Sequence, residues 1–260
     1  MSAEKYFDAV ERLFKEVKNS QMGNIKKVSK MIVETIQNDG MVFCFGTGHS
    51  HMIAEEIFGR AGGFMQVRPI LEPELMVHEN DTKATYMERL TGLAQIYLKN
   101  TPIEKGDLLI IASNSGINSV PVEMALIAKE MGVKTVAVTS VKHSKATPSR
   151  HVSGKKLFEI VDVVLDNCGE PGDAAITIEG VPSKVGATST IMGCLLVNAV
   201  MAEAVAELVK TGQTPSVMFS SNNRDRDGAL YNAKVRMEFS KKLSEREARL
   251  EKRSWEGLAY

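Results

Sequence analysis

Two periods of apolar residues alternate along the chain, and they predict alternating helices and strands. In residues 3–38, apolar side chains recur every three or four positions, which is typical of amphipathic helices. A break near Met22-Gly23 divides this region into two predicted helices, and Asp39-Gly40 ends the second one. The pattern therefore predicts a pair of helices at the N-terminus.

Short and mostly apolar runs follow, and they predict strands buried on both faces of a parallel sheet. Helical patterns with short connections separate these runs, which forces neighbouring strands to lie parallel with right-handed crossovers. The predicted strands are 41–45, 67–70, 107–112, 133–138 and 161–166, and the pattern allows another around 174–178. The predicted helices cover 51–58, 87–99, 120–131 and 188–210, with a charged, Pro-containing loop at 71–85. This alternation predicts an α/β fold, a three-layer doubly wound sandwich.

The chain divides into three predicted segments. Residues 1–38 should pack on the core and reach an oligomer interface, as should the long apolar helix at 188–210. Residues 39–215 form the ligand-binding domain. Residues 216–260 are a charged C-terminal extension, in which 241–253 is either a solvated helix or disordered.

Composition narrows the classes of partner. The 32 basic and 32 acidic residues balance, so no net field draws the protein to nucleic acid or to a membrane surface. The three cysteines fit no disulfide or metal-ligand spacing, which favours buried thiols and a reducing compartment. The N-terminus carries charges throughout and lacks an apolar secretion segment. These features together predict a cytoplasmic protein.

The loop after the first strand can hold an anion. Its glycines allow a tight turn that leaves backbone N–H groups pointing outward, and a helix end follows. The loop consists of Gly46, Thr47, Gly48, His49 and Ser50. It departs from the dinucleotide pattern, because His51 stands where a third glycine is required. Taken alone, this loop also suits simple close packing of helix and strand.

The loop after the central strand gives a more specific signal. It consists of Ser113, Asn114, Ser115, Gly116, Ile117, Asn118 and Ser119. A phosphate needs several short donors with little bulk around them, and this loop combines hydroxyls, amides and a helix N-terminus. N-capping alone explains one such residue, but not five polar residues among seven. The loop therefore predicts a phosphate site.

With both loops in place, the sequence resembles the sugar isomerase (SIS) domain family over about residues 20–210. Thr139-Ser140 after the next strand and Ser189-Thr190 opening the long helix agree with this resemblance. The likeness is strongest to SIS-domain proteins whose first loop is Gly-Thr-Gly-His-Ser-His, and phosphoheptose isomerase is more distant. The resemblance implies a five-stranded parallel sheet, an oligomer, and a phosphosugar at the carboxyl edge of the sheet.

The family's binding residues map onto both loops. The resemblance implies that Ser113, Ser115 and Asn118 hold the phosphate, that Ser50 helps, and that Gly116 makes the turn. Asn118 departs from the family pattern, which has Thr or Ser at this position. We include Gly46, Thr47, Gly48, Asn114 and Ser119 in the predicted substrate site.

Aldose–ketose isomerisation needs a base for a carbon-bound proton and an acid for the oxygens. We predict Glu55 or Glu79 as the base, with His49 or His78 as its partner. Each has an ordinary alternative, such as a surface ion pair for Glu55 or a mobile loop for His78 and Glu79. His143 and His151 fall in a basic segment that we interpret as a solvated loop. The histidines and Glu55 also suit zinc, but a His-x-His pair does not easily place both rings on one ion, and we predict no metal or cofactor.

The sequence thus predicts a phosphosugar-binding protein that forms a homodimer or homotetramer, most simply an aldose–ketose isomerase. Two alternatives stay open. One is a sensor that binds a phosphosugar without chemistry. The other is a lyase or etherase acting on a phosphorylated amino sugar, which would use a similar acid–base pair.

Overall fold

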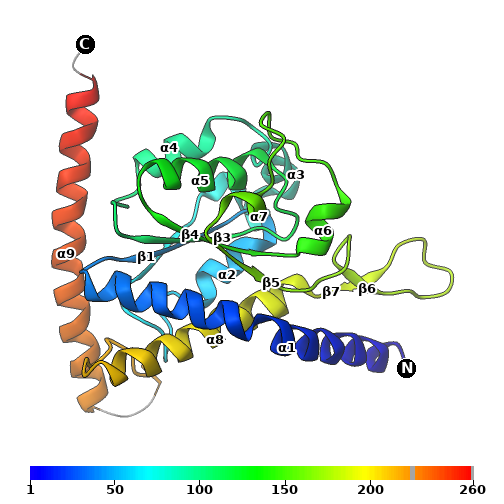
Figure 1. Ribbon diagram of the computed structural model, residues 1–260, viewed down its shortest axis with the longest axis horizontal. Coiled ribbons are helices and arrows are strands. Elements are labelled where there is room, and N and C mark those ends of the chain that lie inside the picture. Colours follow the sequence, from blue (N-terminus) through cyan, green and yellow to red (C-terminus); the bar gives the residue numbers. More distant parts are fainter. Residues whose placement is uncertain (223–225, 259–260) are drawn as a thin grey trace.

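The computed structural model describes residues 1–222 and 226–258, and it contains an open parallel sheet between two layers of helices (Figure 1). The five strands lie in the order β2-β1-β3-β4-β5, and every neighbouring pair is parallel. Their bounds are β1 Val42–Gly46, β2 Val67–Ile70, β3 Leu108–Ala112, β4 Lys134–Thr139 and β5 Val163–Asp166. The predicted three-layer α/β fold with a five-stranded parallel sheet is confirmed.

Alternation along the strands builds a core on each face of the sheet. In β1, Val42 and Cys44 point into one core, and Phe43 and Phe45 point into the other. The first core also contains residues of α1 (Ser2–Gln37), α2 (His51–Glu56) and α8 (Ser189–Lys210). The second contains residues of α4 (Leu93–Lys99), α5 (Ser119–Glu130) and α7 (Leu157–Ile160). The central strands are therefore buried on both sides, as their apolar sequences require.

The predicted pair of N-terminal helices is one continuous helix, α1, so the break expected at Met22-Gly23 is wrong. A glycine costs a helix only about 1 kcal/mol relative to alanine. Gln21 and Ile25 are buried on either side of Gly23, so burial keeps the helical period across it. Tertiary packing outweighs the local propensity here.

Helix α8 is buried where it crosses α1 and the sheet. Leu196, Val197 and Val200 lie in the core, and the Val200 carbonyl accepts a hydrogen bond of 3.0 Å from the Ser29 hydroxyl of α1. By length and composition alone α8 could cross a membrane, a test that the core helix of a soluble protein also passes. Its contacts with α1 and the sheet explain its apolar composition.

Two other local expectations need correction. The predicted loop at 71–85 contains a 3-10 turn (Pro73–Leu75) and helix α3 (Val77–Met87), whose one buried residue, Ala84, leaves too weak a pattern to detect. The strand allowed around 174–178 is β6 (Ala174–Ile176), which pairs antiparallel with β7 (Val185–Ala187) outside the main sheet. The Tyr6 hydroxyl of α1 donates to the Ala187 carbonyl at 2.6 Å and so fixes this hairpin to α1.

The C-terminal extension forms a helix, one of the two alternatives expected for 241–253, and most residues described in that range are exposed. Its contacts with the core, however, were not expected. Helix α9 (Arg226–Leu258) stands beside the sheet (Figure 1). Its Arg246 donates to Asp107 at 2.7 Å, and the two side chains keep only 7% and 1% of their surface exposed. Lys242 pairs with Asp39 and Arg249 pairs with Glu104, each about one turn away from Arg246. Charge pairing holds this polar helix, which is why apolar periodicity did not reveal it.

Asp107 connects three parts of the chain at the start of β3. One carboxylate oxygen accepts the Met41 N–H, and the other accepts the Glu104 N–H, both at 2.8 Å. The second oxygen also receives Arg246. The buried carboxylate is thereby fully hydrogen-bonded and neutralised, which burial of a charge requires.

The cysteines are free and largely buried, as expected. Cys44 and Cys168 are buried and Cys194 is half-buried. Burial raises the pKa of the Cys168 and Cys194 thiols to about 11, and it raises the pKa of Cys44 further. Neutral thiols are poor nucleophiles, so their placement favours a packing role.

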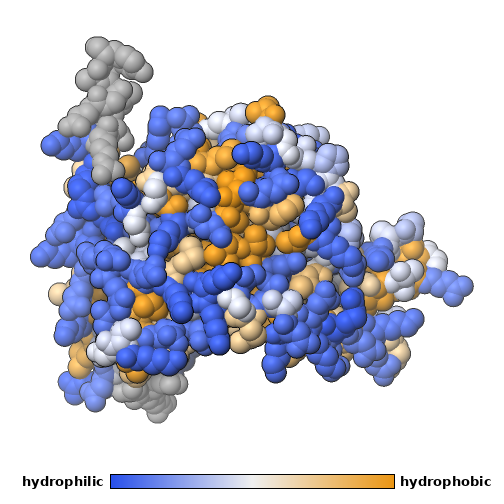
Figure 2. All heavy atoms as spheres, viewed as in Figure 1, coloured by the Kyte–Doolittle hydropathy of each residue, from blue (hydrophilic) through white to orange (hydrophobic). Residues whose placement is uncertain are grey.

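The surface is hydrophilic over most of the face drawn in Figure 2, with apolar residues gathered near its middle. A shallow apolar groove of about 360 Å³ lies between the first half of α1 and the start of α8. Phe7, Phe14 and Ile191 line it and expose 73%, 42% and 44% of their surface. Exposed apolar residues gathered in this way are typical of protein interaction surfaces.

Replacing Arg246 with Met should lower the free energy of unfolding by about 3–5 kcal/mol, because Asp107 would be left as an uncompensated buried charge. Urea denaturation followed by circular dichroism measures this loss. Arg249→Met on the same helix is the matched control, since its ion pair with Glu104 is half exposed and should contribute little. Equal losses for the two variants would contradict the role of the buried pair.

Candidate functional site

The two predicted phosphate loops begin side by side. Strands β1 and β3 are parallel neighbours, and their register places Gly46 opposite Ala112 at the carboxyl edge. The chain crosses from β1 to β2 on one side and continues to β3 on the other, so the point where strand order reverses lies between the loops. Open α/β sheets bind ligands in the crevice at this point.

Glycines let both loops fold tightly. A Cβ atom on Gly46 would lie 2.4 Å from the Ser50 carbonyl oxygen, so only glycine fits there. Gly116 has a φ of +60°, and a Cβ atom on it would lie 3.2 Å from Leu157 and Thr139. These constraints hold the backbone of each loop in a turn at the strand end.

The second loop offers hydroxyl groups in the crevice. The Ser113 oxygen accepts the Gly116 N–H at 3.2 Å, which closes the turn. Ser115 is half-buried, and its hydroxyl makes no hydrogen bond to any other residue that the structure describes. Ser119 begins α5, a helix long enough to present a positive end. The arrangement can bind an oxyanion through hydroxyls, amides and a helix N-terminus together.

Asn114 belongs to a partly buried hydrogen-bond network. Its side-chain oxygen accepts from Asn167 at 2.9 Å, and its carbonyl accepts the Ser140 N–H at 3.0 Å and the Thr139 hydroxyl at 3.2 Å. The side chain of Asn114 therefore ties the loop after β3 to the loop after β5, and its main-chain carbonyl ties it to the end of β4. These contacts position the loop after β3.

Glu88, which the sequence analysis did not include, lies between the two loops. Its carboxylate accepts a hydrogen bond of 2.7 Å from the Thr47 hydroxyl and one of 2.6 Å from the Asn118 amide. Arg150 in turn donates to the Asn118 side-chain oxygen at 2.7 Å. The side chains of Thr47 and Asn118, both predicted to bind substrate, are thus engaged within the protein.

The basic segment beyond β4 keeps most of its charged side chains exposed, as expected, but its backbone packs against the loop after β3. The backbone N–H groups of Arg150 and Leu157 donate to the carbonyls of Ile117 and Gly116 at 2.8 and 2.9 Å. His151 lies 3.6 Å from Glu123 of α5, and both side chains are more than nine-tenths buried. Backbone hydrogen bonds and His151 therefore attach this segment to the core, while most of its lysines stay in solvent.

His143, in helix α6 (Val141–Ala146), is also partly buried. Its Nδ1 accepts the Gly172 N–H at 3.3 Å. Burial lowers the pKa of His143, and the nearby Asp173 opposes this effect. The ring therefore favours its neutral form at this position.

Three of the four predicted acid–base residues gather beside the first loop, around His51. The buried His51 ring lies 5.5 Å from the His78 ring, and its Nε2 atom lies 3.6 Å from the Glu55 carboxylate. His78 lies 3.8 Å from Glu79. The Nδ1 atom of His51 contacts the Gly48 carbonyl, which places a proton on Nδ1. His49 is exposed.

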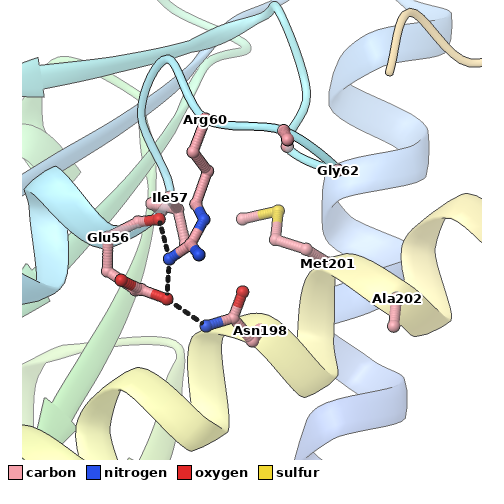
Figure 3. Close-up of a pocket in the computed structure, with 9 residues that line it drawn as sticks. Glu56, Ile57, Arg60, Gly62, Asn198, Met201 and Ala202 are labelled. Atoms are coloured by element: carbon pink, nitrogen blue, oxygen red, sulfur yellow. Dashed lines mark hydrogen bonds and ion pairs between the residues drawn. The ribbon is translucent and has the colours of Figure 1, made fainter. Parts of the chain in front are cut away.

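Glu56, next to Glu55 in sequence, faces a different pocket. Figure 3 shows Arg60 and Asn198 pointing toward it, and Asn198 donates to its carboxylate at 2.7 Å. The pocket, about 360 Å³ in volume, lies between the end of α2 and α8 and is also lined by Met201. Helix α2 therefore directs one carboxylate to the first loop and the next to α8.

The described residues hold no group of three or more His, Cys, Asp or Glu arranged to bind a metal ion. His51 turns its Nδ1 atom to a backbone carbonyl, which leaves one nitrogen of that ring for other contacts. The chemistry available at the first loop is that of carboxylates and imidazoles acting on protons.

Comparison with known proteins agrees with this geometry. The sequence model of the SIS domain matches residues 5–140. A UPF0309 protein of Halalkalibacterium halodurans is 47% identical over 238 residues, which cover 91% of this chain and 96% of that protein. The chain belongs to the SIS-domain family. A UPF0309 protein of Geobacillus thermodenitrificans is 40% identical over 219 residues, or 84% and 88% of the two chains.

Solved structures share the SIS fold at low sequence identity. A phosphoheptose isomerase from Francisella tularensis has a TM-score of 0.51 and 18% identity, covering 78% of this chain and 96% of that one. A protein of E. coli CFT073, solved in complex with a sugar phosphate, has a TM-score of 0.51 and 19% identity, covering 88% and 94%. The sequence comparisons confirm the predicted family. The two solved structures share its fold.

Two residues of the candidate site were not among the predicted site residues. His51 lies directly after the Gly-Thr-Gly-His-Ser loop and four residues before Glu55, but the sequence alone did not favour it over His49 and His78. Glu88 lies outside both loops, within a predicted helix, and no local pattern distinguishes it. Only the fold brings its carboxylate to Thr47 and Asn118.

Proposed function

We propose that this SIS domain binds a sugar phosphate between the loops that follow β1 and β3, and that it interconverts an aldose and a ketose phosphate. The observation that carries the proposal is the register of Gly46 against Ala112, which brings two donor-rich loops together where the strand order reverses. Phosphoheptose isomerase and the E. coli protein with its bound sugar phosphate share this fold, which supports a phosphosugar as ligand.

The phosphate is expected against Ser113, Ser115, Asn118 and Ser119 of the loop after β3, with Thr47 of the loop after β1 beside it. The free Ser115 hydroxyl and the N-terminus of α5 are its principal donors. With the phosphate there, the sugar carbons extend toward the first loop and the cluster around His51. Binding energy from the phosphate then orients the carbons for reaction.

The proposed reaction moves two protons. A carboxylate, Glu55 or Glu79, removes the proton from C2 of the aldose to give an enediol, and it returns that proton to C1. The hydroxyl proton on O2 moves to O1 through a histidine, His49 or His78, so the protons balance without a cofactor. His51 supports the assignment, because it contacts both Glu55 and the ring of His78.

Two further features belong to the proposal. The exposed groove of α1 and α8 is suited to a second copy of this chain, since a homo-oligomer would cover its aromatic residues.

The protein's thiols, which burial holds neutral, suit the reducing cytoplasm.

Replacing Ser115 with Ala should weaken phosphosugar binding by about 1.5–3 kcal/mol, the contribution of a hydrogen bond to a charged group. A thermal-shift screen with hexose, heptose, pentose and amino-sugar phosphates first identifies a ligand, since one at a hundred times its Kd stabilises by ~2.7 kcal/mol. Titration of the two proteins then gives the difference. The unphosphorylated sugar should bind both equally, and equal losses for the two ligands would show that the turn does not bind phosphate.

Replacing the true base with Gln should lower turnover at least about a hundredfold and leave phosphosugar affinity within a few-fold, because Gln keeps size but cannot take a proton. We expect this of Glu55→Gln or Glu79→Gln, with Glu247→Gln on the exposed side of α9 as the control. Full turnover in both variants would refute the assignment.

NMR in D₂O provides a separate test of function. If the unaltered protein binds a phosphosugar tightly and no deuterium enters the carbon skeleton of the sugar, the protein is a sensor.

Light scattering at micromolar concentration should give a mass of at least twice the 28.5 kDa chain. Phe14→Lys should reduce this mass, because a charge in the apolar groove opposes its burial. Met237→Lys, at an exposed position on α9, should leave it unchanged. A 28.5 kDa particle from the unaltered protein would exclude the oligomer.

A further inference from the structure

The carboxylate of Glu88 takes one hydrogen-bond donor from each of the two loops. The Thr47 hydroxyl belongs to the loop after β1, and the Asn118 amide belongs to the loop after β3. These donors keep 5% and 4% of their residue surface exposed. Buried donors require an acceptor, and an anion is their strongest partner.

The main chain of Glu88 is anchored independently of this contact. Its N–H donates to the Ala84 carbonyl at the end of α3, and its carbonyl accepts the Val120 N–H of α5, both at 3.0 Å. The carboxylate could therefore leave both donors by rotation about side-chain bonds, with the backbone in place. The donors would then face the crevice.

Charge argues against Glu88 and a phosphate sharing these donors. Arg150, on the other side of Asn118, balances one negative charge. A phosphate bound to the same loops would bring one or two further negative charges. Repulsion between groups a few ångströms apart in a partly buried crevice is strong enough to shift an equilibrium.

We propose that Glu88 is a resident anion, which occupies the donors of Thr47 and Asn118 in the empty protein and which an incoming phosphate displaces. This inference rests on the proposed phosphate site and adds a residue that opposes binding. Displacement lowers affinity for every phosphate ligand, so that only ligands whose sugar makes further contacts bind well. Glu88 thereby reduces occupancy of the site by free phosphate, which makes no sugar contacts, without changing the ratio of the two affinities.

A purely structural role for Glu88 makes the opposite prediction. If the carboxylate only ties the loops together, its removal loosens them and weakens phosphate binding. If Glu88 is displaced, its removal frees the donors and strengthens binding. The sign of the change therefore separates the two roles.

The test is isothermal titration of the full chain with inorganic phosphate. Glu88→Gln should bind about tenfold more tightly than the unaltered protein, because it loses the charge and can satisfy only one of the two donors. Glu88→Ala should also bind more tightly, and it serves as the second variant if the first does not fold. Circular dichroism verifies that each variant is folded.

Glu130→Gln is the matched control. It removes a carboxylate at the far end of α5, roughly 16 Å from Ser119 along the helix, and should leave phosphate affinity unchanged. Equal or weaker phosphate binding by folded Glu88 variants overturns the resident-anion proposal and leaves the phosphate site intact. Absence of phosphate binding by the unaltered protein and by both variants overturns the phosphate site as well.

Discussion

One buried carboxylate fixes the alignment on which the site depends. Asp107 begins β3 and accepts the N–H of Met41, the residue before β1, so it sets the position of one strand against the other at their amino ends. Parallel strands keep that register along their length. At the opposite edge it places Gly46 beside Ala112, where the two loops start. The crevice between these loops is therefore a consequence of a hydrogen bond at the other end of the sheet.

The sequence predicts those helices and strands in which buried apolar residues recur at a short, regular spacing. Apolar runs such as Leu108–Ala112 can be recognised because both faces of a central strand are covered, and the phosphate loops follow because ligands gather at strand ends. A single glycine is a less dependable sign that a helix ends. Gly23 lies within a helix whose buried face continues past it, so tertiary packing decided an outcome that glycine alone suggested otherwise.

Contacts made by charged residues across long sequence separations could not be predicted. Arg246 meets Asp107 across 139 residues, and Glu88 meets Thr47 across 41. Neither partner belongs to a repeating pattern, and each would be an ordinary surface residue in another fold. Since both pairs lie near the sheet edges, the residues hardest to predict are those that hold the helix α9 and the candidate site in place.

The long separation between Asp107 and Arg246 also bears on how the chain acquires its structure during synthesis. At about 5–20 residues per second, the 139 residues that follow Asp107 up to and including Arg246 take about 7–28 s to be made. Throughout that interval the first strands exist without the cation that neutralises the carboxylate between them. Burial of a lone charge is costly, so the amino ends of β1 and β3 stay hydrated until α9 arrives. The docking of α9, the last helix to be made, therefore sets the time at which water leaves the amino ends of β1 and β3.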